Sequence, residues 1–247
     1  AVYTDSVNGY NVTFVDDDGT VLLDATEYPY GTEVSEIVFP EEPTKEATVE
    51  YTYTFSGWTP EVSTVTGDVT YTATYSTTIN EYSVEFVDED GTVILEATSY
   101  PYGTVAADII MPEEPSKDPT AQYTYTFAGW SPDVTDVTGD VTYTASYTST
   151  INQYTISYSF SDINEVVDAV LPDSATLDYG TEYTAEKVVD ITGYSFDGWY
   201  TDAACSEDNR YVDGTVLTGD LTLYGNYISN AYAVTFDANG GDGEISD

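Results

Sequence analysis

The sequence lacks most of the side chains that enzymes use for catalysis. Its 247 residues include no histidine and a single cysteine, Cys205. Nucleophile–base pairs need such groups, so we expect no catalytic residues and no enzymatic activity. Paired carboxylates are present, but 45 acidic residues in one chain lie near one another by chance. One cysteine also excludes a disulfide within the chain.

Positive charge is nearly as scarce. Four Lys and Arg residues stand against 45 Asp and Glu residues, which gives a net charge of −41. A polyanion repels phosphate groups, so nucleic acid is excluded as a partner and docking on anionic lipid is disfavoured. No apolar run approaches the ~20 residues of a membrane-spanning helix, so we expect no membrane insertion in this segment. The acidic residues are spread along the chain, which is typical of a folded protein with a solvated acidic surface.

The most prominent feature of the sequence is an internal repeat. The segment Tyr51–Trp58 returns as Tyr123–Trp130, 72 residues later, and each of the three tryptophans follows a glycine. Within the segment, aromatic residues alternate with threonines, which predicts a strand with one buried face. Residues 10–81 and 82–153 align without a gap and are identical at 46 of 72 positions. The chain is therefore a tandem array.

This recurrence predicts the domain organisation. We expect the end of a preceding repeat at residues 1–9, complete repeats at 10–81, 82–153 and 154–231, and the start of a further repeat at 232–247. The third repeat carries an insertion at 201–211, which contains Cys205 and Arg210. Connections of about six residues, such as Ser76–Glu81, lack the glycine and serine of flexible linkers.

Each repeat is predicted to hold four strands. Asp18-Gly19 between two apolar runs indicates a tight hairpin turn, whereas Pro40 and Pro43 predict a loop with at most a short helix in residues 32–49. The expected fold class is mainly β, α+β at most. Tryptophan is expected to be the largest core residue of each repeat. The predicted core residues are Trp58, Trp130, Trp199, Tyr53, Phe55, Tyr125, Phe127 and Phe196.

Three stretches carry a family resemblance. Residues Tyr194–Asp202, Thr218–Tyr224 and Val234–Gly241 resemble the Listeria/Bacteroides repeat, the internalin-type B-repeat family. The resemblance covers nearly the whole chain. It implies a β-grasp-like module of four strands with a short helix or loop, strung in tandem on large secreted or wall-attached bacterial proteins. It therefore implies an extracellular location at the bacterial cell surface and a stalk or adhesion role, with no catalytic residue set.

Three functions remain open at this point. The leading hypothesis is a stalk or spacer that projects a distal domain, with the neighbouring repeats of the chain as its partners. The alternative is an adhesive module that binds a host protein or glycan through exposed Tyr and Thr faces or through the insertion at 201–211. A second alternative is a self-associating surface filament, because the edges of sheets can pair with other chains.

Two further groups of residues have weak candidate roles. Asp16, Asp18, Asp88 and Asp90 stand near glycines as in the start of a calcium loop, but no bidentate Glu follows, so hairpin turns are favoured and no cofactor is expected. Lys45, Lys117 and Lys187 lie 13, 13 and 12 residues before a tryptophan. They are expected to form ion pairs with surplus carboxylates or isopeptide bonds to asparagines. The candidate asparagines are Asn80, Asn152 and Asn230.

Overall fold

The computed structural model describes residues 6–161 and 169–235 of the chain. It is almost entirely β, with 48% strand and 4% helix. The expected mainly β fold of small four-stranded sheets is therefore confirmed. The predicted partial repeats fall in part on residues 1–5 and 236–247, which lie outside the described residues, as does the segment 162–168 of the third repeat.

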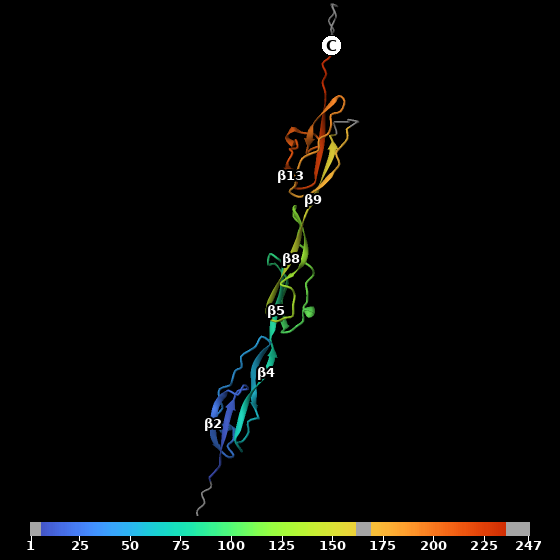
Figure 1. Cartoon of the computed structure of the whole chain (residues 1–247). Coiled ribbons are helices and arrows are strands. Elements are labelled where there is room, and N and C mark those ends of the chain that lie inside the picture. The colour runs from blue at the N-terminus through green and yellow to red at the C-terminus, as the bar shows by residue number, and fades with distance from the viewer. Residues whose placement is uncertain (1–5, 162–168, 236–247) are drawn as a thin grey trace, which may run out of the picture. The chain divides into compact units, whose positions relative to one another are not determined.

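Each complete repeat contains one four-stranded sheet (Figure 1). The first sheet consists of β1 (Gly9–Val15), β2 (Val21–Pro29), β3 (Tyr51–Thr59) and β4 (Val69–Ile79). The second consists of β5 (Glu81–Val87), β6 (Val93–Pro101), β7 (Tyr123–Ser131) and β8 (Val141–Ile151). The third consists of β9 (Gln153–Phe160), β10 (Ala175–Asp178), β12 (Tyr194–Tyr200) and β14 (Leu221–Ser229).

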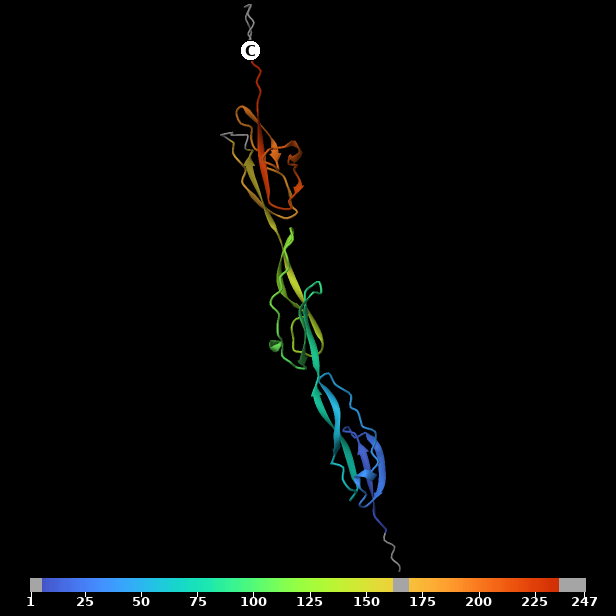
Figure 2. The same ribbon diagram turned by 180° about the vertical axis from the view of Figure 1, so that it is seen from behind.

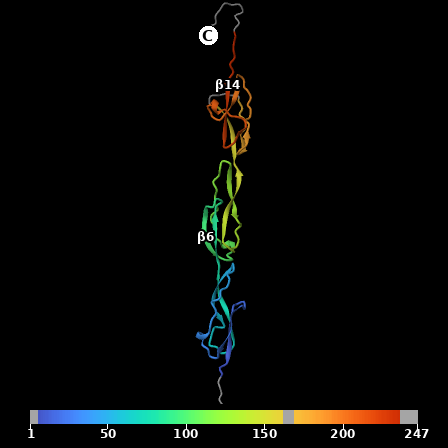
Figure 3. The ribbon, with the colours of Figure 1, turned by 90° about the vertical axis from the view of Figure 1, so that its left-hand side faces the viewer.

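The three sheets share one topology. In the first sheet the strand order is β2-β1-β4-β3, with β1 antiparallel to β2, parallel to β4, and β4 antiparallel to β3. The chain therefore passes from one edge of the sheet to the other between β2 and β3. Figure 2, seen from behind, shows this crossing segment in light blue beside the sheet. The third sheet has the corresponding order β10-β9-β14-β12, with β14 labelled in Figure 3.

The crossing segment contains no α-helix. In the first repeat its only regular element is the 3-10 helix η1 (Val34–Glu36), and the second repeat has η2 (Ala106–Asp108) at the same place. Pro40 and Pro43 follow, and proline removes a backbone donor and restricts the residue before it. The predicted loop with a short helix matches this structure, and the crossing helix of a β-grasp module is replaced by extended chain.

The core of the first repeat forms where the sheet meets the crossing segment. Val12 and Phe14 of β1 and Tyr71 of β4 are at most 2% exposed, as their alternation with polar residues predicts. Ile37 of the crossing segment, which is 5% exposed, packs against them. The most buried aromatic residue is Phe14, whereas Trp58, predicted to be the largest core residue, lies half-buried at the edge of the cluster.

A β-bulge explains why glycine precedes tryptophan in every repeat. The register between β3 and β4 shifts between Phe55 and Gly57, and Gly57 has a φ of 135°. Residues with a side chain rarely adopt such positive φ values. The extra residue places Phe55 and Trp58 on the same face, with ring centroids 5.2 Å apart. Gly129 and Gly198 have φ values of 127° and 154°.

The third repeat departs from the other two. The insertion after β12 contains the 3-10 helix η3 (Glu207–Asn209) and returns through a bridge between Tyr200 and Arg210. A second, two-stranded sheet pairs β11 (Glu182–Tyr183) with β13 (Thr215–Val216). The sequence did not predict this pair, because strands of two residues carry no periodicity.

The chain forms two compact units, Ala1–Pro115 with Ala128–Ser146, and Ser116–Phe127 with Tyr147–Asp247. The division passes through the second repeat. The first unit therefore contains the junction between the first and second repeats, and the second unit contains the junction between the second and third.

Candidate functional site

The junction between the first and second repeats is a single residue. β4 ends at Ile79 and β5 begins at Glu81, so only Asn80 separates them. In the same way, Asn152 alone separates β8 from β9. The sequence predicted a connection of about six residues here. The connection is shorter because β4 pairs with β3 as far as Ile79, opposite Tyr51.

Asn80 is hydrogen-bonded through its backbone and its side chain. Its amide Nδ2 donates to the carbonyl oxygens of Thr48 and Val49, at 2.7 and 3.2 Å, and its Oδ1 accepts from Thr52 Oγ1 at 2.7 Å. Its backbone N–H donates to the Glu50 carbonyl at 2.8 Å. Its own carbonyl accepts from the N–H of Tyr102, in the second repeat, at 2.8 Å. Asn80 therefore joins the end of one repeat to the beginning of the next.

The second junction repeats this arrangement. Asn152 Nδ2 donates to the carbonyls of Thr120 and Ala121, at 2.8 and 3.1 Å, and Oδ1 accepts from Thr124 Oγ1 at 2.7 Å. The Asn152 carbonyl accepts from the N–H of Tyr179, in the third repeat, at 2.8 Å.

A tyrosine adds a second bond at each junction. The hydroxyl of Tyr82, in β5, donates to the carbonyl of Val49 in the first repeat at 2.6 Å. The hydroxyl of Tyr154, in β9, donates to the carbonyl of Ala121 in the second repeat at 2.7 Å. These bonds cross from one repeat to the next, so they restrain rotation about the one-residue connection.

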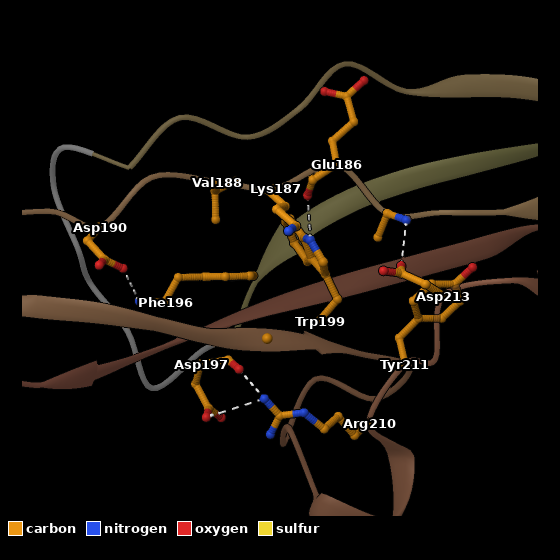
Figure 4. Close-up of a pocket in the computed structure, with 12 residues that line it drawn as sticks. Glu186, Lys187, Val188, Asp190, Phe196, Asp197, Trp199, Arg210, Tyr211 and Asp213 are labelled. Carbon is orange, nitrogen blue, oxygen red and sulfur yellow. Dashed lines mark hydrogen bonds and ion pairs between the residues drawn. The ribbon is translucent and has the colours of Figure 1, made fainter.

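A cavity of about 320 Å³ lies in the third repeat. Its floor is formed by Phe196 and Trp199 of β12, and Lys187 and Arg210 lie at its rim, from the crossing segment and from the insertion (Figure 4). Trp199 is 6% exposed and its indole N–H donates to the Glu186 carbonyl at 2.8 Å. Two of the four cations of the chain therefore line one cavity.

Backbone contacts hold the walls of the cavity in place. Asp190 Oδ1 accepts from the N–H of Phe196 at 2.9 Å, and Asp213 Oδ1 accepts from the N–H of Ala185 at 3.0 Å (Figure 4). Because these two carboxylates already accept from the backbone, they fix the loops on either side of the cavity.

Arg210 belongs to a partly buried polar network. Its guanidinium pairs with Asp197 and donates to the hydroxyl of Tyr200 at 3.0 Å. Tyr200 is fully buried and donates to Asp197 Oδ2 at 2.5 Å. Burial, together with the negative charge of Asp197, raises the pKa of Tyr200 to about 12. The network fastens the insertion to β12.

We expect Asp197 to make the stability of the third repeat acid-sensitive. The hydrogen bond from Tyr200, together with Asn226 and Arg210, holds the pKa of Asp197 below its usual value of 3.8. Because the pKa is lower in the folded state than in the unfolded state, the stabilisation is present above about pH 4 and is lost as the pH falls through the folded-state value. Asp197→Asn should therefore lower the urea midpoint at pH 7, and the difference from wild type should shrink toward about pH 2. If the difference in urea midpoint between wild type and Asp197→Asn stayed constant across this pH range, Asp197 would not be the source of the acid sensitivity.

A sequence model of the Listeria-Bacteroides repeat domain matches residues 10–80, 82–153 and 154–225. The chain belongs to this family. Each match begins within one residue of the first strand of a sheet, so one family repeat corresponds to one sheet with its crossing segment. The family consists of non-catalytic repeats that are typical of surface proteins.

Two proteins of Evansella cellulosilytica are similar in sequence to this chain. One, named "Putative Gly-rich membrane protein", is 28% identical over 96% of this chain and 27% of its own length. The other, named "Putative membrane protein", is 25% identical over 94% of this chain and 34% of its own length. The chain thus spans about a quarter to a third of these relatives. In the part of the chain that the structure describes, no helix is long and apolar enough to cross a membrane.

A solved structure of streptococcal SHIRT domains 3-4, from a cell surface protein, is 19% identical to this chain. The matched region covers 58% of this chain and 99% of the SHIRT chain. Its TM-score is 0.29. A similarity of this size supports no conclusion about this chain.

The lysines of the first two repeats lie over tyrosine rings. Lys45 pairs with Asp17, and its Nζ lies 4.9 Å from the ring of Tyr53. Lys117 Nζ lies 4.3 Å from the ring of Tyr125. The isopeptide hypothesis requires a lysine beside an asparagine, but Lys45 has Asp17 as its partner, and the Asn80 side chain bonds elsewhere. The two lysines fasten the crossing segment to the sheet by cation–π contacts, whereas Lys187 lines the cavity instead.

The candidate calcium residues form hairpin turns. Asp16 Oδ1 accepts from the N–H of Asp17 at 2.8 Å and from the Tyr75 hydroxyl at 2.7 Å, and Asp18 Oδ1 accepts from the N–H of Thr20 at 2.8 Å. In the second repeat, Asp88 and Asp90 accept from Glu89 and Thr92 in the same way. Within residues 6–161 and 169–235, no three His, Cys, Asp or Glu residues lie together as a metal site.

The remaining predicted core residues are half-buried, and of these only Trp130 and Phe196 pack against a core cluster of the described residues. Phe55 and Phe127 contact Tyr75 and Tyr147, at centroid distances of 6.1 Å in both repeats. Tyr53, Tyr125, Trp130 and Phe196 are also half-buried. Sequence reasoning missed the junction role of the asparagines, although a signal was present: Asn8, Asn80 and Asn152 recur every 72 residues, each two residues before a tyrosine.

Proposed function

We propose that this chain is a stiff spacer in an extracellular bacterial surface protein and that it projects a distal domain from the cell. The observation that carries this proposal is the fastened one-residue junction, which occurs twice with the same hydrogen bonds. An array in which each repeat contacts only its neighbours behaves as a quasi-one-dimensional assembly. Fixing each junction then keeps the distance between the two ends of the array large.

Repetition and charge support the same role. Two repeats with 46 of 72 positions identical are the expected product of duplication for length, whereas a dedicated binding site needs to occur only once. The net charge of −41 makes like-charged segments repel each other within a Debye length of ~8 Å at physiological salt. This repulsion opposes folding back and sideways aggregation. In this role the chain has no enzymatic activity.

We expect the length of the spacer to grow in proportion to the number of repeats. The test lengthens the full chain by additional copies of residues 82–153, attaches one end to a surface and measures the height of a fluorescent label at the other end. For a stiff array, doubling the number of repeats should increase the height about twofold. A flexible chain grows as the square root of its length, so growth of only about 1.4-fold would contradict the proposal.

A second function is favoured by the cavity of the third repeat. The adhesive alternative placed binding on exposed Tyr and Thr faces or in the insertion at 201–211, and Arg210 and Tyr211 of this insertion line the cavity. A spacer that carries one binding repeat among structural ones combines both roles.

A further inference from the structure

The cavity of the third repeat lies where the crossing segment contributes a smaller residue to the core than in the other two repeats. The cores of the first two repeats receive Ile37 and Ile109 from this segment, both at most 5% exposed. The core of the third repeat receives Ala185, which is 7% exposed. Alanine fills less volume than isoleucine and itself lines the cavity. The cavity volume of about 320 Å³ lies in the lower part of the ~300–1,000 Å³ range of small-molecule sites.

We propose that this cavity binds a neutral sugar unit of a glycan, which is a function beyond that of a spacer. A pyranose ring has an apolar face of C–H groups and a rim of hydroxyl groups. The cavity offers matching surfaces, with aromatic rings at its floor and charged groups at its rim. Small-molecule sites are typically apolar, with a few well-placed polar groups that fix the orientation of the ligand.

The aromatic floor is held rigidly. Phe196 and Trp199 lie with ring centroids 5.1 Å apart at an angle of 63°, and the ring of Tyr158 also packs against Trp199, with centroids 4.7 Å apart. The indole N–H of Trp199 is already bonded to the Glu186 carbonyl. The rings are therefore fixed before a ligand arrives, with the half-buried Phe196 more accessible than Trp199, and a pre-formed site loses less conformational entropy on binding.

The charges around the cavity favour a neutral ligand. The chain carries a net charge of −41, which opposes an anionic ligand. Four carboxylates line the cavity, those of Glu186, Asp190, Asp197 and Asp213, together with the cations Lys187 and Arg210, so a charged ligand of either sign meets a like charge. The two cations can donate to sugar hydroxyls, and the exposed carboxylate of Glu186 can accept from them. A ligand with many hydroxyls and no net charge uses these donors and acceptors without either repulsion.

The test titrates the full chain with glucose, galactose and N-acetylglucosamine, each as a monosaccharide and as a trisaccharide. Glucosamine and N-acetylneuraminic acid serve as the cationic and anionic comparisons. Saturation-transfer NMR detects the bound sugar, and the indole N–H resonance of Trp199 reports the site. We expect saturable binding of at least one neutral sugar, with a shift of the Trp199 resonance. No saturable binding of any neutral sugar, or tighter binding of a charged one, would overturn the proposal.

Two variants locate the site. Ala185→Ile restores the residue type that fills the first two cores and should weaken binding by about tenfold or more by occupying the cavity. Lys187→Ala removes an exposed donor and should weaken binding by about three- to tenfold. Lys45→Ala, the matched lysine of the first repeat, should leave binding unchanged. Urea unfolding checks that each variant folds, and affinity equal to wild type in folded Lys187→Ala would place any binding elsewhere and overturn the proposal.

Discussion

Replacing Phe14 with alanine should destabilise the first repeat by about 3–5 kcal/mol, the usual cost of truncating a buried phenylalanine. Phe14 is 0% exposed, and its ring lies 4.8 Å from Trp58 and 5.2 Å from Tyr71. Its removal leaves a cavity between the sheet and the crossing segment. A domain of this size has a stability of only roughly 4–11 kcal/mol. The variant should therefore lose most of the stability of the first repeat.

Urea unfolding followed by tryptophan fluorescence measures this effect. The wild-type transitions of the first two repeats should overlap, because their cores share the same residue types. In the variant, one transition should move to much lower urea while the transition of the third repeat stays in place. Phe39→Ala is the matched control, since Phe39 contacts Phe14 at 5.3 Å but is 43% exposed. If Phe14→Ala and Phe39→Ala lowered the stability of the first repeat equally, Phe14 would not be the centre of the core.

Removing the junction bonds should make the connection between the first two repeats flexible. The Asn80 side chain makes three hydrogen bonds and the Tyr82 hydroxyl makes one. At about 0.5–1.5 kcal/mol each, they contribute roughly 2–6 kcal/mol to the fixed geometry. Without them, Asn80→Ala with Tyr82→Phe should keep both repeats folded but widen the rotation about residue 80, where only the backbone bonds of Asn80 to Glu50 and Tyr102 remain.

Spin labels at Asp24 and Glu96 test this prediction. These exposed residues occupy equivalent places in β2 and β6, and Cys205 is replaced by serine so that only the labelled sites react. Pulsed electron–electron resonance should give a narrow distance distribution in the otherwise wild-type chain and one at least about twice as wide in the double variant. Labels at Asp24 and Thr54, within the first repeat, provide the control and should show no change. Equal widths across the junction would mean that these bonds do not hold it.

Much of the fold could be predicted from the sequence because its signals are local. The alternation of aromatic residues and threonines in Tyr51–Trp58, the Asp18-Gly19 turn and the 72-residue recurrence each depend on a few neighbouring residues. Local signals could not predict that Phe14 is fully buried whereas Trp58 is only half-buried. This difference depends on the bulge at Gly57 and on which strand lies at the centre of the sheet, and both are set by non-local pairing.

The sites were less predictable for the same reason. Asn80 is visible in the sequence, but its partners at Thr48 and Val49 lie more than 30 residues away. The insertion at 201–211 could be recognised, whereas the cavity that it borders is also lined by residues of other segments, such as Ala185 and Trp199. Neither arrangement has a periodic pattern that would indicate it.

Small-angle X-ray scattering of the full chain tests the spacer most directly. Three repeats arranged end to end, at ~3.3 Å per strand residue, should give a maximum dimension of about 100 Å or more. Raising the salt to 1 M, where the Debye length falls to ~3 Å, should leave this dimension nearly unchanged, because the junction bonds persist when charge repulsion is screened. A radius of gyration near ~18 Å, the value for a compact chain of 247 residues, would contradict the account.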